Sequence, residues 1–207
     1  MTSAVPFTAA TSGLRGLARD ALVWLGVALL APLWIFAWVE RRVARRDGWF
    51  AGCAELLSLV PGKPGIFLRR SFYRMTLAVC ATDCHIGFGT TFAHPDAEIH
   101  AGVYVGSRCT IGSATLEQDV TIGSNVDILS GRRQHGFGRL DLPIQQQGGA
   151  FQQVRIGRNS WIGNSSVIMA DVGEDSVVGA AAVVVRPIAP GSIAVGNPAE
   201  VIRTRAA

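Results

Sequence analysis

The sequence predicts a mainly β protein in which short strands stack as a triangular parallel coil. An aliphatic or aromatic residue recurs about every six positions between Ile86 and Val184. Glycine often follows that residue, as in the IGSN and IGRN segments, and glycine supplies 24 of the 207 residues. Six residues suit one flat strand and one turn, so three such units close a coil of about 18 residues.

The recurring residues form three inward faces when they are read in threes. Each set stacks without a leftover residue, so the pattern predicts about five coils over residues 86–187 and a C-terminal tail over residues 188–207. The first face is Ile86, Val105, Ile122, Ile162 and Val178, the second is Phe92, Ile111, Ile128, Ile168 and Val184, and the third is Ile99, Leu116, Ile156 and Val172.

A segment over residues 131–153 interrupts the repeat. An insertion of this length inside a regular coil is usually functional, and we expect it to protrude as a loop. The segment contains His135 and several polar side chains that suit a sugar ligand. These are Arg132, Arg133, Gln134, Asp141 and the three glutamines at positions 145–147.

The first part of the chain predicts a membrane anchor. Residues 21–39 carry no charge, and as a helix these 19 residues would measure about 28 Å, close to the thickness of a bilayer's hydrocarbon core. Four arginines, Arg41, Arg42, Arg45 and Arg46, follow at once, which puts the C-terminal side in the cytoplasm. We therefore expect a tail over residues 1–20 and an anchor helix with a basic flank over residues 21–48.

Tryptophan, glycine and proline residues in this segment relate to the orientation of the anchor in the membrane. Trp24, Trp34 and Trp38 suit the membrane–water interfaces. Gly26 and Pro32 leave open whether the segment spans the membrane or lies in it. The alternative is a buried helix of a soluble protein.

Residues 49–85 predict an amphipathic helical region. One helix covers residues 49–60 and stops before Pro61-Gly62, and a second covers residues 65–79. A helix with one apolar and one basic stripe suits a lipid surface, and the alternative is a helix that caps the domain after it. The apolar stripe is Leu68, Phe72, Met75 and Val79, and the basic residues are Arg69, Arg70 and Arg74.

The distribution of charge argues against nucleic acid as a partner. Residues 1–80 hold ten basic and four acidic groups, a net charge of +6, whereas residues 81–207 hold nine basic and eleven acidic groups, a net charge of −2. The basic part is also the apolar part, which favours an anionic membrane surface. A nucleic-acid reader would carry its positive charge on the folded domain.

The cysteines and most histidines indicate structural roles. Four cysteines in 207 residues are not a disulfide framework, and in a cytoplasmic domain we expect free thiols. Cys80, Cys84 and His85 lie close together, but no second ligand pair follows at zinc-site spacing, so we expect no metal. His94 and His100, like His85, fall at turn positions and are also expected to be structural.

Residues 80–205 resemble the hexapeptide-repeat acyltransferases. The segment SWIGNSSVIMADVGEDSVVGAAAVVVRPIAPGSIAVGNPAEVIRTR is similar to that family's C-terminal signature along its whole length. The resemblance implies a left-handed parallel β-helix, a homotrimer and acetyl-CoA as co-substrate. The segments PGKPGIFLRRSFYRMTL and IGFGTTFAHPDAEI resemble a membrane-associated branch near the xenobiotic and exopolysaccharide O-acetyltransferases, similar to colanic acid acetyltransferases.

The resemblance assigns roles to individual residues. His135 matches the loop histidine that acts as general base, and a neutral imidazole with a pKa near ~6.5 suits that task. Glu200 stands where a basic residue is frequent, and Val185 stands where threonine is frequent. The positions that match donor-binding residues are Trp161, Gly163, Asn164, Ala180, Val185, Arg186 and Arg203. The resemblance does not assign acceptor residues; Arg132, Arg133, Gln134 and Asp141 are expected to bind an acceptor because they are polar residues of the loop.

The sequence thus predicts an O-acetyltransferase that moves acetyl from acetyl-CoA to a saccharide hydroxyl in exopolysaccharide or cell-surface glycan synthesis. It would work at the cytoplasmic face of the bacterial inner membrane, on an acceptor that is a candidate for lipid linkage. A small-molecule acceptor such as an antibiotic or amino acid is the alternative. A γ-carbonic-anhydrase-like enzyme would need three histidine ligands, and a non-catalytic β-helix would not need the His135 loop.

Overall fold

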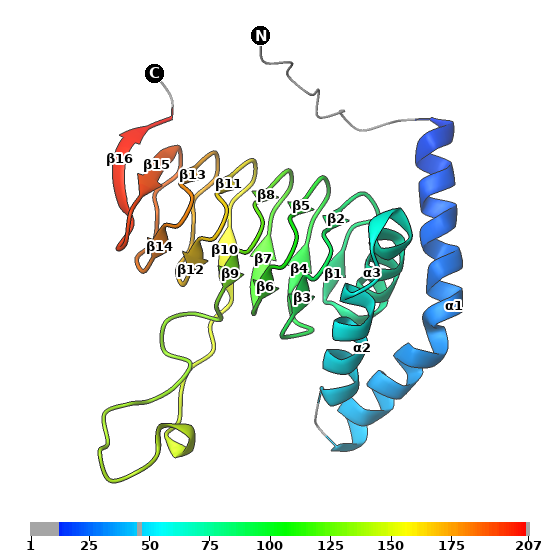
Figure 1. Ribbon diagram of the computed structural model, residues 1–207, viewed down its shortest axis with the longest axis horizontal. Helices are drawn as coiled ribbons and strands as arrows, with labels where there is room; N and C mark the ends of the chain where they lie inside the picture. Colours follow the sequence, from blue (N-terminus) through cyan, green and yellow to red (C-terminus); the bar gives the residue numbers. More distant parts are fainter. Residues whose placement is uncertain (1–12, 45–46, 206–207) are drawn as a thin grey trace.

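The computed structural model describes residues 13–44 and 47–205. Three helices precede a regular coil of short strands, and they gather at the N-terminal end of that coil (Figure 1). The helices are α1 (Leu14–Ala44), α2 (Gly48–Ser58) and α3 (Gly62–Thr76). Arg45, Arg46 and the predicted tail up to residue 12 lie outside the described residues.

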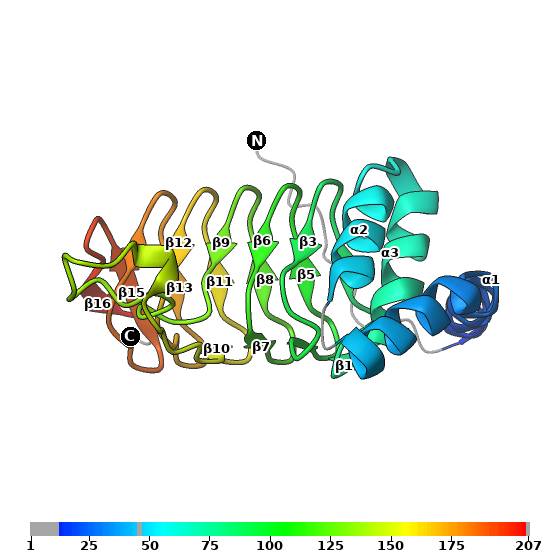
Figure 2. The same ribbon diagram turned by 90° about the horizontal axis from the view of Figure 1, so that it is seen from below.

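The strands form three parallel sheets that run along the sides of a prism, as the view from below shows (Figure 2). We name each sheet by its first strand. The β1 sheet comprises β1 (Val79–Cys80), β4 (Glu98–Ile99), β7 (Ala114–Leu116) and β10 (Val154–Ile156). The β2 sheet comprises β2 (His85–Ile86), β5 (Tyr104–Val105), β8 (Thr121–Ile122), β11 (Trp161–Ile162), β13 (Val177–Val178) and β15 (Ser192–Val195), with antiparallel β16 (Glu200–Thr204) at its edge. The β3 sheet comprises β3 (Thr91–Phe92), β6 (Thr110–Ile111), β9 (Asp127–Ile128), β12 (Val167–Ile168) and β14 (Val183–Val184).

The register of these sheets confirms the three predicted faces. Ile86 pairs with Val105, and Phe92 pairs with Ile111, so each residue stacks on its counterpart one coil later. Ile99 likewise pairs with Leu116, and every predicted inward residue is buried. Because the period of the pattern fixes which residues meet, the spacing alone predicts the pairing.

The coil is longer than the predicted five coils and makes about six turns. Cys80 pairs with Ile99 at the start, while Ile188 continues the β1 sheet through a bridge to Val172. Ala194 extends the β2 sheet by pairing with Val178. The coil therefore begins at Val79, before residue 86, and ends at Val195, beyond residue 187. Cys80 and Ala194 fill inward positions at the ends without a large aliphatic side chain, so the aliphatic pattern does not show them. Ile188 does fit that pattern but was assigned to the tail.

Two of the three corners of the prism use left-handed backbone. Between the β2 and β3 sheets, Asn125 and Ser165 have φ of 56° and 59°, and between the β1 and β2 sheets Asn159 has φ of 54°. Asparagine tolerates this conformation better than most residues, which is why it recurs after the glycine of the repeat. The third corner joins the β3 sheet to the β1 sheet, and the loop of residues 131–153 leaves from it; we call it the loop corner.

Helices α2 and α3 cap the first coil with an aromatic cluster. Tyr73 contacts Phe92 edge to face, with ring centroids 4.7 Å apart, and Phe50 and Phe72 continue the cluster into the helices. All four side chains are buried. The helices therefore share one hydrophobic core with the coil, as the capping alternative predicts.

The predicted lipid-facing role of Arg69 and Arg70 is wrong, because both side chains are buried. The Arg69 guanidinium donates to the carbonyl oxygens of Leu57 and Val60, at 3.1 and 2.8 Å, and its Nε donates to that of Ile86 at 3.0 Å. It thus ties the end of α2 to the coil. These carbonyl acceptors, which lie at least nine residues away in sequence, have no signal in the helical pattern.

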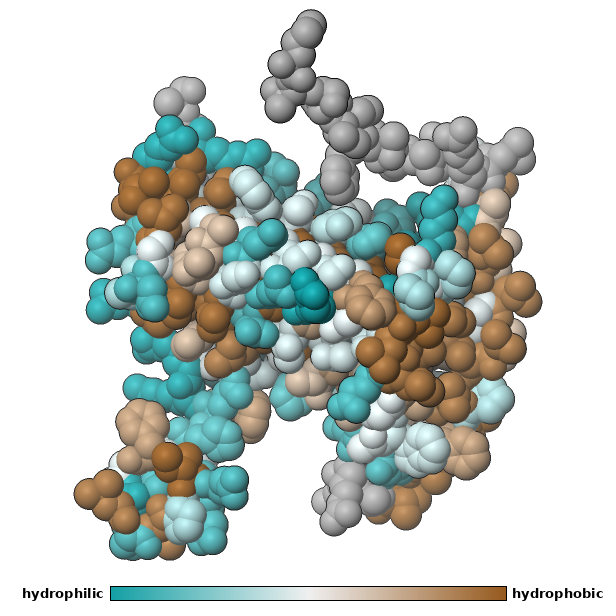
Figure 3. All heavy atoms as spheres, in the orientation of Figure 1, coloured by the Kyte–Doolittle hydropathy of each residue, from teal (hydrophilic) through white to brown (hydrophobic). Residues whose placement is uncertain are grey.

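Helix α1 includes the whole uncharged segment 21–39 and begins inside the predicted tail. Its segment Gly16–Val43 is long and apolar enough to cross a membrane, by length and composition alone. Val23 and Leu30 are buried, and the helix packs against α3. The space-filling view shows the apolar residues that gather over the outer side of α1 (Figure 3).

Candidate active site

The loop of residues 131–153 leaves the coil between β9 and β10 and projects well away from it (Figure 1). Its neck is a short backbone ladder in which Ala150 N donates to Arg133 O at 2.7 Å and Gln152 N donates to Ser130 O at 3.0 Å. The two arms of the loop are therefore joined by backbone hydrogen bonds where they leave the coil.

The tip of the loop is held by its own polar side chains. The Gln147 side-chain amide donates to the carbonyl oxygens of Arg139 and Leu142, and its oxygen accepts from Arg139 N. Arg139 and Asp141 form an ion pair that lowers the pKa of Asp141. Asp141 and Gln147, two of the predicted acceptor ligands, thus hold the loop in shape.

His135 lies just beyond the neck, with an exposed side chain. Gly149, on the returning arm of the loop, and Gly136, next to His135, allow the backbones of the two arms to approach closely at this point. A Cβ on Gly149 would overlap the carbonyl oxygen of Gln134 and come within 2.8 Å of His135 N, and a Cβ on Gly136 would meet Gly148 O. These contacts fix the position of the His135 backbone relative to the neck.

For the base that the sequence predicts at His135, Gly149→Ala is expected to lower activity about tenfold or more, because a misplacement of about 1 Å at a reacting group is costly. The loop is outside the coil core, so the melting temperature should stay close to that of wild type. Gly138→Ala is the matched control, since a Cβ there meets nothing within 4 Å. Steady-state acetyl transfer and thermal unfolding of both variants measure this, and equal activities would show that the glycine contact does not position His135.

A groove of about 550 Å³ lies at the loop corner, at the root of the loop. It brings together Arg132, predicted for the acceptor, and Val185 with Arg186, predicted for the donor. The rest of its wall was not predicted from the sequence. That wall is Gln152, Gln153, Val154, Met169, Ala170, Asp171 and Pro187.

A second hollow of about 290 Å³ lies beside the loop on the β3 sheet. Gln134 lines it together with His94, Asp127 and Ser130. The His94 ring packs edge to face against Phe151 of the loop, with centroids 5.4 Å apart. His94, which was expected to be structural, thus packs on the loop and also faces this hollow. Its place two coils before the loop on the same corner is the signal that could have identified it.

The remaining predicted donor residues do not join the groove. Trp161, Gly163, Asn164 and Ala180 lie on β11 or at the corner between the β2 and β3 sheets, and Arg203 lies on β16. Asn164 accepts from Ser124 N at 3.0 Å, and Gly163 stacks so closely on Ala180 that a Cβ would not fit. A triangular coil separates this corner from the loop corner, so one chain presents the donor residues in two places.

The other predicted structural residues are packed inside or along the coil. The His85 ring stacks on Tyr104 with centroids 4.4 Å apart, and burial, with the charges of Arg70 and Arg69, lowers its pKa. His100 contacts Glu98 at 3.3 Å. The Cys80 and Cys84 sulfurs lie 3.8 Å apart as free thiols. Within residues 13–44 and 47–205, no three His, Cys, Asp or Glu side chains form a group that could hold a metal ion.

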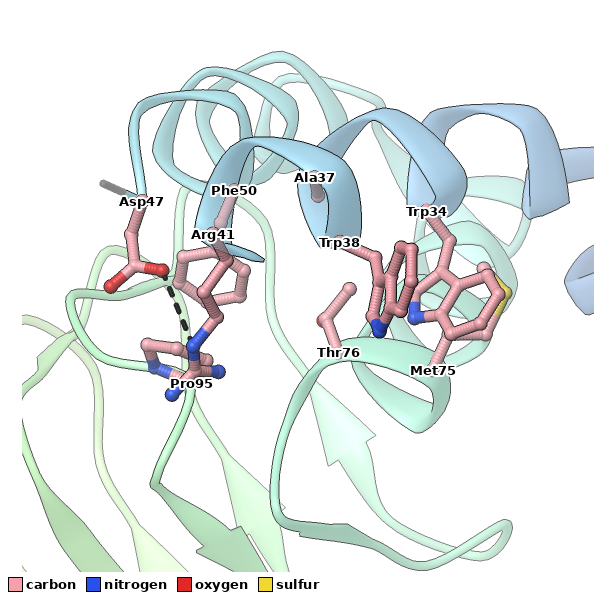
Figure 4. Close-up of a pocket in the computed structure, with 9 residues that line it drawn as sticks. All are labelled: Trp34, Ala37, Trp38, Arg41, Asp47, Phe50, Met75, Thr76 and Pro95. Carbon is pink, nitrogen blue, oxygen red and sulfur yellow. Dashed lines mark ion pairs between the residues drawn. The ribbon is translucent and has the colours of Figure 1, made fainter. Parts of the chain in front are cut away.

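A separate cavity of about 220 Å³ opens between the second half of α1 and the first coil. Trp34 and Trp38 point toward Met75 and Thr76 across it, and Arg41 reaches toward Asp47 at its other end (Figure 4). The cavity lies at the helical end of the molecule, far along the coil from the groove beside Arg186.

Comparison with known proteins identifies the repeat. A family model described as the hexapeptide repeat of succinyl-transferase matches residues 153–186. A serine acetyltransferase from Mycobacterium tuberculosis is 32% identical over 110 residues, which cover 51% of this chain and 44% of that protein. An acetyltransferase homologue from Schizosaccharomyces pombe is 33% identical over 113 residues, or 51% of this chain and 52% of the homologue. The chain thus spans about half the length of the curated relatives that it matches.

Solved structures share the coil. A maltose O-acetyltransferase from Clostridium difficile 630 superposes with a TM-score of 0.67 at 20% identity, over 75% of this chain and 84% of its own. A galactoside acetyltransferase in complex with coenzyme A gives 0.56 at 23% identity, over 75% and 79% of the two chains. These likenesses show the left-handed β-helix fold. Residues 153–186 thus match the hexapeptide repeat, and the chain is similar to hexapeptide-repeat acetyltransferases in its repeat and in its fold.

Proposed function

We propose that the protein is an acetyl-CoA-dependent O-acetyltransferase that acts on a hydroxyl of a saccharide. One observation carries the proposal: the His135 loop leaves the coil beside the groove that Arg132, Val185 and Arg186 line. Similar folds in a maltose O-acetyltransferase and in a galactoside acetyltransferase bound to coenzyme A support the same chemistry. A base on a projecting loop and a groove at its root are the two parts that acyl transfer needs.

In the proposed reaction, the neutral imidazole of His135 takes the proton of the acceptor hydroxyl. The hydroxyl oxygen then attacks the thioester carbonyl carbon, and a C–O bond forms in a tetrahedral intermediate. Collapse of this intermediate breaks the C–S bond, and the imidazolium returns its proton to the departing thiolate. The products are the acetyl ester and free coenzyme A, so no other reactant is required.

We propose that the donor site is completed between copies in a homotrimer. The donor residues lie on two corners of one coil, and in a threefold assembly one corner of each copy faces a different corner of the next. The loop supports this arrangement, because Phe137, Leu140 and Ile144 are 75%, 99% and 56% exposed in the single chain. Apolar side chains this exposed gain from burial against a neighbouring copy. Arg186 and Arg203 are the cations that would hold the phosphates of the donor.

We propose that the enzyme is attached to a membrane through α1 and that its acceptor is lipid-linked. Helix α1 exposes large apolar side chains such as Leu25 and Leu29, at 67% and 70%. An anchored enzyme meets a lipid-linked acceptor at high effective concentration, whereas a soluble acceptor gains nothing from the anchor. The proposal includes a location at the cytoplasmic face of the bacterial inner membrane, where acetyl-CoA is available, and a role in exopolysaccharide or cell-surface glycan synthesis.

The experiment that tests the activity measures transfer of labelled acetyl from acetyl-CoA to a panel of acceptors. The panel contains nucleotide sugars, lipid-linked oligosaccharides and serine, the last because of the relative from M. tuberculosis. We expect ester formation on a sugar hydroxyl, with release of one thiol for each ester. Transfer to serine alone would replace the saccharide acceptor, and absence of any thioester turnover would reject the enzyme.

Acidic substitutions on the outer face of α1 are expected to lower activity on a lipid-linked acceptor more than on a soluble one. Leu25→Asp with Leu29→Asp should lower acetylation of a lipid-linked acceptor at least tenfold but that of a short soluble analogue less than twofold. These side chains are mostly exposed, so their replacement removes little packing. Ala101→Asp with Gln118→Asp, at an exposed corner of the coil, is the control of equal charge. Equal losses on both acceptors would reject the lipid-linked acceptor.

A further inference from the structure

We infer that α1 lies in the plane of the membrane, with its outer face in one leaflet, and does not cross the bilayer. The inference rests on the proposed membrane attachment and states how that attachment is made. It follows from how α1 is fixed to the rest of the molecule, from the faces that it buries and exposes, and from the arginines along its edge.

Helix α1 has one protein-facing side and one outer side along its described length. Gly16, Val23 and Leu30 are buried and follow one another at intervals of seven residues, so they lie on the same side of the helix. Large apolar side chains on the other side are exposed from one end to the other. These include Leu17, Leu25, Leu29, Phe36 and Val43, at 70%, 67%, 70%, 56% and 80%. A helix divided in this way suits an interface between protein and lipid.

Helix α1 is locked to α3 along its first half. The Ser71 hydroxyl of α3 lies 3.0 Å from the carbonyl oxygen of Val23, to which it can donate a hydrogen bond. Gly26 packs so closely on Ser71 that a Cβ would overlap the serine side chain. The body of the protein therefore sits beside the helix, at the same level as its apolar residues.

This packing is incompatible with a crossing helix. If the segment Gly16–Val43 spanned the bilayer, Trp24 would lie about 12 Å below the membrane surface at which the segment begins. The Arg74 guanidinium, which lies over the Trp24 ring at 5.9 Å, would then be at that depth in hydrocarbon. The first coil follows α3 directly and would be drawn in with it, although the backbone and charges of a soluble coil are not tolerated there.

The shape of α1 points the same way. Pro32 lies inside the helix, and α1 changes direction partway along its length as it wraps around α2 and α3 (Figures 1 and 2). Proline causes such bends because it lacks the N–H that the helix needs. A helix that follows the surface of its own domain cannot also run straight through a bilayer.

Two tryptophan–arginine pairs support a lipid leaflet as the occupant of the outer face. Arg74 lies over Trp24, and Arg42 lies over Trp38 at 5.5 Å. The two tryptophans are about 21 Å apart along the helix and lie on neighbouring directions around it. Trp24 lies before Pro32 and Trp38 after it, so each half of α1 carries one pair, and we call the two pairs the headgroup row. Indole rings and guanidinium groups both favour the headgroup level, so a pair on each half suits a helix that lies along the membrane surface.

The depth of labelled cysteines tests this inference in the full-length protein. The four native cysteines are buried, so single cysteines at Leu17→Cys, Leu29→Cys and Val43→Cys can be labelled with a fluorophore. The protein is reconstituted in phosphatidylcholine–phosphatidylglycerol vesicles that carry a nitroxide either near the headgroup or near the end of the acyl chain. We expect the shallow nitroxide to quench all three labels most strongly, as for a helix about 5–10 Å below the surface.

Other quenching patterns would overturn the inference. A crossing helix would place the Leu29→Cys label near the deep nitroxide and the other two near opposite surfaces. A second copy on this face would leave all three labels unquenched and allow the cysteines of two copies to cross-link. A label at Val201→Cys, at the far end of the coil, is the control that should not be quenched in any case. The measurement needs no acetyl transfer, so its failure is separate from that of the proposed reaction.

Substitution of the two arginines of the headgroup row is a second test on the same protein. Arg42→Gln and Arg74→Gln are each expected to lower partitioning into these anionic vesicles about fivefold, and Arg108→Gln on the coil should have no effect. If all three variants partitioned into the vesicles as strongly as wild type, Arg42 and Arg74 would not contact lipid headgroups.

Discussion

Replacement of His135 by alanine is expected to lower acetyl transfer by about 10²–10⁴-fold while the fold stays intact. The loss follows from the absence of a base for the acceptor hydroxyl, because Arg132, Arg133 and Gln134 beside it do not accept a proton at neutral pH. The side chain of His135 is exposed, so the substitution removes no core packing. Single-turnover transfer to a fixed acceptor measures the loss, and circular dichroism verifies the coil.

His94→Ala is the comparison that makes this test specific. His94 lines the hollow beside the loop and packs on Phe151, so its loss should loosen the loop and lower activity less than tenfold. A His135→Ala enzyme within threefold of wild type, with His94→Ala strongly impaired, would move the base to His94. A mixture of His135→Ala and Arg186→Ala chains that regains activity after reassembly would show that the two residues act from different copies.

The coil could be predicted from the sequence because its register is a consequence of spacing. Ile122 stacks on Val105 and under Ile162 because equivalent positions recur at a nearly regular spacing, and the loop adds length at one corner. The same reasoning places His135 on a protruding loop. Prediction was weaker at the ends of the coil, where Cys80 and Ala194 occupy inward positions without an aliphatic side chain.

The candidate site could be predicted in part. Arg132 was expected to meet the acceptor and Arg186 the donor, and both side chains line one groove. Asp141 and Gln147 were expected to meet a ligand. In the structure Asp141 pairs with the Arg139 side chain, and Gln147 satisfies backbone groups of the loop. Asn164 and Arg203 belong to other parts of the prism, and a linear motif does not say which corner each of its residues occupies.

Arg69 shows why a helical pattern can assign a side chain to the wrong surface. The pattern groups it with Arg70 and Arg74 as a basic stripe, and Arg74 is indeed exposed. Arg69, however, meets carbonyl oxygens at the end of α2 and at Ile86, which lie nine to 17 residues away in the sequence. A guanidinium can satisfy several carbonyls at once, so burial of this charge depends on tertiary contacts that no local spacing contains.

Arg69→Met is therefore expected to lower the free energy of unfolding by about 3–5 kcal/mol, the largest stability effect that we predict. Methionine replaces the aliphatic part of the side chain but not the guanidinium, so the carbonyls of Leu57, Val60 and Ile86 lose the donor that Arg69 supplies. Arg74→Met is the matched control, since that exposed side chain donates to one carbonyl, of Cys80, at 2.8 Å, and should cost about 1 kcal/mol or less. Urea unfolding in mild detergent, followed by circular dichroism, measures both. Equal losses would show that Arg69 does not join α2 to the coil, and the helical cap would then depend on the aromatic cluster of Phe50, Phe72 and Tyr73 alone.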